Sequence, residues 1–214
     1  MRVFVYVGML VLATSAAGAE SSGEAALSER GDSRRFLVAP KLGGSFPQVL
    51  SRLSTSYTVA LEVGYATPLF GERLVLSAEA SYTQPPHART LEDPRVGDGT
   101  TSYTVTERIF GMYAGPKLHF ALPASRFILF AGIGVRAQLI ASAIEATSGG
   151  EDFGSHTETG THLAFAGLLG VGYRMGPGHL SLDLQLVSSP IDHRVTGDVD
   201  VGALSVRVGY LLSL

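Results

Sequence analysis

The sequence predicts an all-β fold, a closed antiparallel up-and-down transmembrane β-barrel of about eight strands. Three observations predict it. Large apolar residues recur at every second position through most of the chain after residue 35. The opposite face of each alternating segment carries small residues and isolated charges. Hydrophobic residues make up 45% of the 214 residues and charged ones only 16%, yet no apolar run is long enough for a transmembrane helix.

The last stretch, 204–214, shows the alternation most clearly. Its large apolar residues are Leu204, Val206, Val208, Tyr210, Leu212 and Leu214. A period of two predicts a strand with one apolar face and one small or polar face. We expect this strand to close the barrel.

The same pattern predicts seven earlier strands. Their ranges are 36–44, 57–66, 73–83, 101–120, 127–146, 161–174 and 179–187. Polar stretches separate them, and long and short connections alternate along the chain. This alternation is typical of outer-membrane barrels, which have brief periplasmic turns and longer extracellular loops. We therefore expect extracellular loops near 46–56, 84–100, 147–160 and 188–200.

The composition of the minor face decides which face meets lipid. It consists largely of Gly, Ala, Ser and Thr, as at Gly64, Ser77, Gly132 and Gly172. A water-facing exterior would carry many long charged side chains, whereas the narrow interior of an eight-stranded barrel admits mainly small ones. The apolar face is therefore predicted to face hydrocarbon. A secreted, soluble lipocalin-like binding barrel, the alternative, would turn that face inward.

Six charges of the minor face come out at comparable depth when counted from the nearest short turn or chain end, with Glu79 slightly higher. They are Lys41, Glu62, Glu79, Lys117, Asp183 and Arg207. A charge away from water is costly unless it is paired. We therefore predict that these three acids and three bases form an ion cluster, a lumen ionic plug. A small barrel filled in this way is not a general diffusion pore.

The N-terminal region is predicted to lie outside the fold. Residues 1–19 have the features of a secretory signal peptide, with Arg2, an apolar run and a small-residue cleavage site. Residues 20–35 are polar, without periodicity, and are predicted to be a flexible tail. The barrel domain is then 36–214.

Composition also excludes several functions. A net charge of −3 gives no reason to expect nucleic acid, and without cysteine there are no disulfides or thiol chemistry. The six histidines lack the spacing of a helical zinc site, and no nucleophile-turn or phosphate-loop motif is present. We expect no metal, no cofactor, no enzymatic activity and a monomer.

Five segments carry a resemblance to a known family. They are KLGGSF at 41–46, ERLVLSAEASYTQ at 72–84, AGPKLHF at 114–120, ILFAGIGV at 128–135 and LGVGYRMGPGHLSLDL at 169–184. Together they resemble the small bacterial outer-membrane β-barrel domain family often labelled porin-like. The resemblance implies residence in the outer membrane of a Gram-negative cell envelope, among its lipids.

The C-terminal strand resembles the signal that the barrel assembly machinery reads in that family. Arg207 supplies the polar residue, Gly209 follows it, and Leu212 and Leu214 are the hydrophobic residues. The family usually ends in an aromatic residue, whereas Leu214 stands here. The resemblance implies that the assembly machinery is a partner during biogenesis.

Two roles remain open at this stage. The first is a structural or interaction role, in which the long loops contact an unidentified extracellular partner. The alternative is a lipid hydrolase, because His179 and Ser181 resemble the His-x-Ser pair of lipid A deacylases. That pair is expected at the periplasmic end, whereas in those enzymes it faces the outer leaflet.

Overall fold

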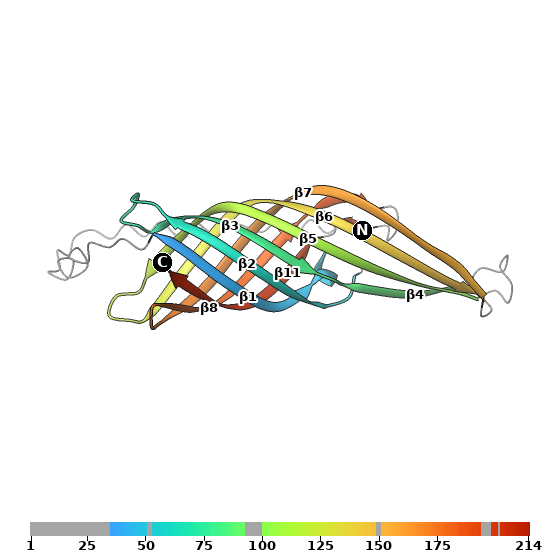
Figure 1. Ribbon diagram of the computed structural model, residues 1–214, viewed down its shortest axis with the longest axis horizontal. Helices are drawn as coiled ribbons and strands as arrows, with labels where there is room; N and C mark the ends of the chain where they lie inside the picture. The colour runs from blue at the N-terminus through green and yellow to red at the C-terminus, as the bar shows by residue number, and fades with distance from the viewer. Residues whose placement is uncertain (1–34, 51–52, 93–99, 149–150, 194–197, 201) are drawn as a thin grey trace, which may run out of the picture. The chain divides into compact units, whose positions relative to one another are not determined.

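The computed structural model describes residues 35–50, 53–92, 100–148, 151–193, 198–200 and 202–214. Within these residues, eight antiparallel strands close into one barrel (Figure 1). Seven are single elements: β1 (Phe36–Phe46), β2 (Ser56–Ala66), β5 (Thr100–Ala121), β6 (Phe127–Ser148), β7 (Glu151–Met175), β8 (Gly178–Ser188) and β11 (Ala203–Ser213). The eighth combines β3 (Leu74–Thr83) and β4 (Pro86–Glu92), which pair with β5 one after the other.

Closure depends on the C-terminal strand. β11 pairs with β8 on one side and with β1 on the other, from Leu37 opposite Ser213 to Phe46 opposite Leu204. Each remaining strand pairs with its neighbours in the sequence. The predicted fold class and the closing role of this strand are confirmed.

Short turns gather at the end of the barrel where the chain terminates (Figure 1). They connect β2 to β3, β5 to β6 and β7 to β8. The β7–β8 turn is the tightest, and Gly176 there has φ of 61°. Only glycine adopts that left-handed conformation without a steric penalty.

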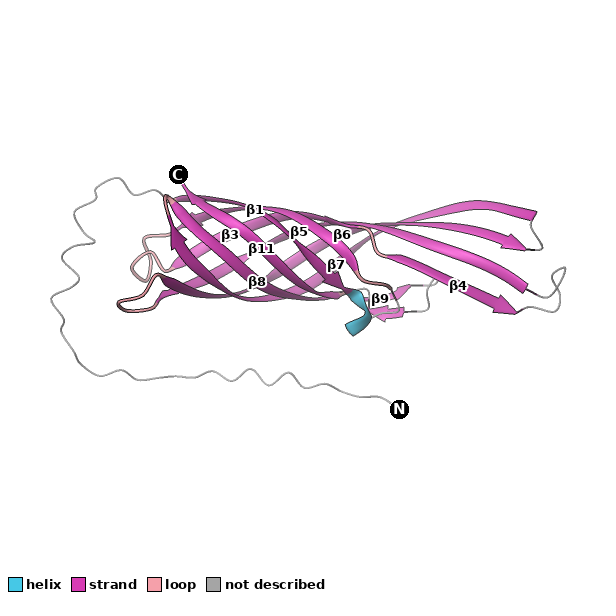
Figure 2. Ribbon diagram, turned by 90° about the horizontal axis from the view of Figure 1, so that it is seen from below, coloured by secondary structure: helices cyan, strands magenta, loops and turns pink. Residues whose placement is uncertain are grey.

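The opposite end is formed differently from the prediction. We expected loops at 84–100 and 147–160, but β4 spans Pro86–Glu92, and β6 and β7 run to Ser148 and from Glu151. These strands extend beyond the barrel as a sheet in the order β4-β5-β6-β7 (Figure 2). The prediction was wrong because apolar and polar residues alternate along a strand only where one of its faces is buried. A strand outside the membrane can have water on both faces and is then held by its backbone hydrogen bonds alone.

Of the other two long connections, the first is irregular apart from one short helix, as predicted, whereas most described residues of the second form strands. The first contains a single-turn 3-10 helix, η2 (Pro47–Val49). The second contains a two-stranded ribbon of β9 (Pro190–His193) and β10 (Asp198–Asp200). Asp200 fastens this ribbon to the barrel rim, since its carboxylate accepts hydrogen bonds from the Ser188 hydroxyl and the Ser189 amide. In the described residues, no helix is long and apolar enough to cross a membrane.

The distribution of side chains is the reverse of that in a soluble barrel. Large apolar side chains lie outside: Tyr57 is 86% exposed, Leu163 77% and Phe165 71%. Charged side chains lie inside, with Asp183 only 1% exposed. Two aromatic pairs, Phe36–Tyr65 and Phe127–Tyr173, sit on the outside at the turn end, each with ring centroids 5.3 Å apart. The predicted orientation is confirmed, and the lipocalin-like alternative is wrong because its apolar face would be buried.

The N-terminal predictions are not covered by this structure. The expected signal peptide, 1–19, lies outside the described residues, and so does all of the expected tail at 20–35 except its last residue.

Candidate functional site: the ion cluster in the lumen

The structure brings together the six charged residues singled out from the sequence. Each comes from a different strand and points inward, because side chains alternate along a strand. All six are at most 6% exposed. We call this set the ion cluster: Lys41 on β1, Glu62 on β2, Glu79 on β3, Lys117 on β5, Asp183 on β8 and Arg207 on β11.

Lys41 is the centre of the ion cluster. Its Nζ lies 2.5 Å from Glu62 Oε2, 3.0 Å from Glu79 Oε2 and 2.7 Å from Asp183 Oδ2. Glu62 and Glu79 are directly opposite each other on β2 and β3. Like charges in that position repel each other. The Lys41 ammonium group contacts both carboxylates and so offsets this repulsion.

Two further cations complete the pairing. Arg207 Nε donates to Asp183 Oδ1 at 2.7 Å, and its Nη1 donates to Glu79 Oε1 at 2.5 Å. Lys117 Nζ donates to Glu62 Oε1. Every carboxylate of the ion cluster therefore contacts two cations, and the formal charges balance. An unpaired charge in the buried interior would be costly. Equal numbers of positive and negative side chains therefore allow this interior to fold.

A polar layer continues from the ion cluster toward the loop end, and sequence reasoning did not assign it. Arg136 on β6 donates through Nη1 to Gln185 Oε1 at 3.0 Å and through Nη2 to Ser81 Oγ at 2.5 Å. The guanidinium lies against Gly111, where a Cβ would collide with it. The available signal was that Arg136 occupies the same strand face as Gly132 and Gly134, which placed it in the lumen.

Aromatic side chains cover the ion cluster on the turn side. Lys117 Nζ lies 5.6 Å from the centroid of the Phe130 ring, close enough for a cation–π interaction. The His119 ring is 5.6 Å from Phe130 and 6.2 Å from His179. A cavity of about 10 Å³ lies between these side chains and the ion cluster. This is at the lower limit of the space that one water needs.

Connecting segments contribute buried side chains at the loop end. Leu53 and Ser189 are both fully buried, and Pro47 of η2 is also buried. The described residues thus place buried side chains in the lumen at the loop end, at the ion cluster and on the turn side.

His179 and Ser181, the candidate hydrolase pair, both lie inside the lumen and are buried. Ser181 Oγ donates to the Gly209 carbonyl at 3.3 Å, and His179 Nε2 is buried without a hydrogen-bond partner. A nucleophile and its base must be hydrogen-bonded and must reach the substrate. The pair shares a strand face, as predicted, but it is enclosed near the turn end.

The four residues that resemble a C-terminal assembly signal lie in different surroundings. Arg207 belongs to the ion cluster. A Cβ on Gly209 would lie 2.7 Å from the Pro40 carbonyl oxygen and 2.8 Å from Lys41 Cγ, so glycine lets the two strands and Lys41 approach. Leu212 is partly buried, and Leu214 is 62% exposed on the outer surface.

A closed barrel with an apolar exterior and buried charged side chains in its interior defines a class, the integral membrane β-barrels. With eight strands, short turns at one end and long extensions at the other, the protein is a small outer-membrane β-barrel.

Comparison with known proteins gives fold likeness only. No protein-family model matches the sequence, and no curated protein matches it. Among solved structures, Neisserial surface protein A is 16% identical, with a TM-score of 0.49 over 85% of this chain and 98% of that one. Ail of Yersinia pestis is 16% identical, with a TM-score of 0.43 over 83% and 97%. The N-terminal β-barrel domain of Pseudomonas aeruginosa OprF is 12% identical, with a TM-score of 0.40 over 83% and 98%.

Proposed function

We propose that the protein is a structural and interaction barrel of the outer membrane whose lumen is plugged by the ion cluster and does not conduct solutes. The observation that carries this proposal is the contact of Lys41 with three carboxylates from three strands. A solute can pass only if these contacts break.

The energetics support a closed lumen. Removing one partner from a buried ion pair costs about 3–5 kcal/mol. Since every 1.4 kcal/mol is a factor of ten in an equilibrium, breaking even one such pair limits the open form to about one molecule in a hundred or fewer. A general diffusion pore, which must stay open, is incompatible with that population.

The test is solute flux through the reconstituted full-length mature protein. Proteoliposomes are placed in small sugars and their swelling is recorded, with planar-bilayer conductance as a second measurement. We expect no swelling above that of empty liposomes. The triple variant Lys41→Ala/Glu62→Ala/Lys117→Ala is expected to raise conductance.

A matched control removes the same charges outside the lumen. Arg126, Glu158 and Arg174 are exposed, so their triple alanine variant also loses two cations and one anion and is expected to leave conductance unchanged. Rapid sugar entry through the wild-type protein would overturn the proposal.

The interaction role is proposed for the projecting sheet of β4 to β7. Among the described residues, 151–164 of β7 pair only with β6 and β4 pairs only with β5, so the sheet has two edges that no described strand covers. Such edges accept an added strand from a partner. The extracellular partner would bind here, away from the membrane.

Orientation is tested by epitope insertion in cells. A tag between β6 and β7 is expected to bind antibody on intact cells. The same tag between Gly176 and Pro177, in the β7–β8 turn, is expected to be reached only after the outer membrane is permeabilised. The reverse pattern would place the projecting sheet in the periplasm and remove the proposed extracellular role.

Recognition of β11 by the barrel assembly machinery is the proposed route of biogenesis. Arg207, Gly209, Leu212 and Leu214 would be read before the strand closes the barrel. Replacing the terminal residue separates assembly from stability: Leu214→Ser is expected to slow assembly in cells and to leave spontaneous refolding into detergent micelles unchanged. Equal slowing of both would show a folding defect instead.

We propose no enzymatic activity, because His179 and Ser181 are enclosed in the lumen. The Ser181 hydroxyl donates to the Gly209 carbonyl, and His179 Nε2 does not accept a hydrogen bond from it. Incubation of the protein with lipopolysaccharide, followed by mass analysis of lipid A, is expected to show unchanged acyl chains. Loss of an acyl chain that depends on Ser181 would restore the hydrolase alternative.

A further inference from the structure

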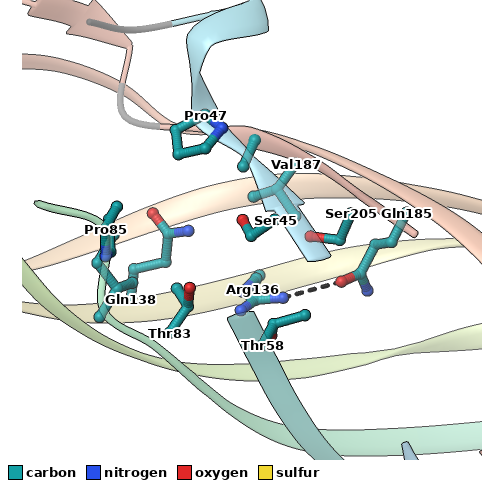
Figure 3. A pocket seen from close by; sticks show the side chains of 12 residues that line it. Ser45, Pro47, Thr58, Thr83, Pro85, Arg136, Gln138, Gln185, Val187 and Ser205 are labelled. Atoms are coloured by element: carbon teal, nitrogen blue, oxygen red, sulfur yellow. Dashed lines mark hydrogen bonds between the residues drawn. The ribbon is translucent and has the colours of Figure 1, made fainter. Parts of the chain in front are cut away.

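The larger hollows of the described chain lie on the outer surface of the barrel. Inside, the cavity beside Arg136 has a volume of about 20 Å³ and has room for about one water (Figure 3). Outside, a groove of about 430 Å³ crosses β3, β5, β6 and β7. We call it the rim groove, and its outward-facing lining includes Tyr82, Arg108, Phe110, Ala141, Thr159 and Thr161.

Strand pairing sets the shape of the rim groove. Ala141 on β6 lies opposite Arg108 on β5 and opposite Thr159 on β7. These three side chains form one row on the outer surface, and the middle one is only a methyl group. In the next row toward the turns, Phe110 lies opposite Tyr82. The groove therefore opens over Ala141, between a cationic side chain and a hydroxyl, with aromatic rings on its turn side.

The rim groove lies where the apolar band of the outer wall ends. On β5 the outward residues from Phe120 to Phe110 are all apolar, and Arg108 is the next outward residue. At about 3.3 Å per residue, this part of the strand is about 33 Å long. With a tilt of about 40° it rises by about 25 Å, the height of the apolar band in membrane barrels. Outward residues of β7 likewise change from Leu163 to Thr161 near this level. Arg108 therefore lies at the level of the lipid headgroups.

The charge of Arg108 is not matched within the groove. Arg108 is exposed, and no carboxylate of the described residues lies within ion-pair distance of it. The two nearest acids in the strands point away, because side chains alternate: Glu107 is buried in the lumen, and Glu158 lies on the face of β7 opposite to Thr159. Thr159 and Thr161 add two exposed hydroxyls to the groove. A guanidinium with hydroxyls beside it matches the oxygens of a phosphate.

We propose that the rim groove binds the headgroup phosphate of an anionic membrane lipid. The Arg108 guanidinium and the Thr159 hydroxyl donate to the phosphate oxygens, and the headgroup occupies the space over Ala141. The acyl chains lie along the apolar wall toward the turns, past Phe110 and Leu163. Contact with these chains favours a lipid over free phosphate. The inference depends neither on a closed lumen nor on which side of the membrane the projecting sheet faces.

Lipid competition tests the proposal. The full-length mature protein is released from nanodiscs that contain equal amounts of phosphatidylglycerol and phosphatidylcholine with identical chains, and the first retained lipid is identified by native mass spectrometry. We expect phosphatidylglycerol to be retained at least about fivefold more often, because one arginine near a lipid surface contributes about that factor to the affinity for anionic lipid. Arg108→Gln is expected to bring the ratio close to one. Arg126→Gln, which removes an exposed arginine at the turn end, is expected to keep it.

Filling the groove distinguishes a shaped site from general attraction to surface charge. Ala141→Leu keeps every charge and fills the space between Arg108 and Thr159, so it is expected to lose the preference as Arg108→Gln does. Ala131→Leu makes the same change on the same face of β6, nearer the turns, and is expected to behave as the wild type. A wild-type ratio near one contradicts the proposal, and so does a preference that survives either Arg108→Gln or Ala141→Leu.

Discussion

Replacing Lys41 by methionine tests the ion cluster most directly, because methionine keeps much of the side-chain volume and removes only the charge. Lys41 contacts three carboxylates at 2.5, 3.0 and 2.7 Å. The variant leaves those three carboxylates with two cations, so the buried site gains a net negative charge. We expect the free energy of unfolding to fall by about 3–5 kcal/mol, as for other broken buried pairs.

The matched double variant distinguishes charge balance from lost packing. Adding Glu79→Gln to Lys41→Met restores neutrality and leaves two intact pairs, Arg207 with Asp183 and Lys117 with Glu62. We expect the double variant to be about 1–3 kcal/mol more stable than Lys41→Met alone, a typical coupling energy for residues in one network.

Unfolding by urea or guanidinium in detergent or vesicles supplies the assay. The chain contains no tryptophan, so far-UV circular dichroism and the gel mobility of unheated samples replace tryptophan fluorescence. Two results would refute the reasoning: a Lys41→Met variant within 0.5 kcal/mol of wild type, roughly the scatter of surface substitutions, or a double variant less stable than the single one.

Two further substitutions examine the lumen and the lipid face. Gly111→Ala places a Cβ against the Arg136 guanidinium and is expected to cost about 1–3 kcal/mol, whereas a Cβ on Gly167 meets nothing within 4 Å. Equal unfolding curves for these two alanine variants would show that the lumen is looser than described. Leu182→Arg puts a charge on the apolar outer surface and is expected to cost about 2–4 kcal/mol near the bilayer midplane. The same residue in place of exposed Glu158, above the membrane, should have little effect, and a similar loss at both sites would contradict the lipid-facing assignment.

Period-two patterns were sufficient for the barrel wall and its orientation. Leucines and tyrosines alternate with glycines and serines because lipid and a narrow lumen impose opposite demands on neighbouring residues. The same reasoning failed at 84–100 and 147–160, where strands extend beyond the barrel. No alternation is required there, so the pattern that identifies a strand was missing.

The candidate site was only partly accessible to the same reasoning. Counting residues from the short turns selected Lys41, Glu62, Glu79, Lys117, Asp183 and Arg207, which the structure brings into contact. This count overlooked Arg136. It gives the position of a residue along its strand and does not show which side chains meet across the lumen. Gln185 and Ser81, the partners of Arg136, carry no charge and therefore gave no signal.

What the sequence determined by itself is the periodicity of each strand, and with it the side of the wall on which every residue lies. What only the tertiary structure decided is which inward residues meet: the stagger between strands places Lys41 among three carboxylates and Arg136 beside Gln185 and Ser81. The physical reason is that alternation is a local property of the backbone, whereas stagger depends on how all eight strands tilt and pair when the barrel closes.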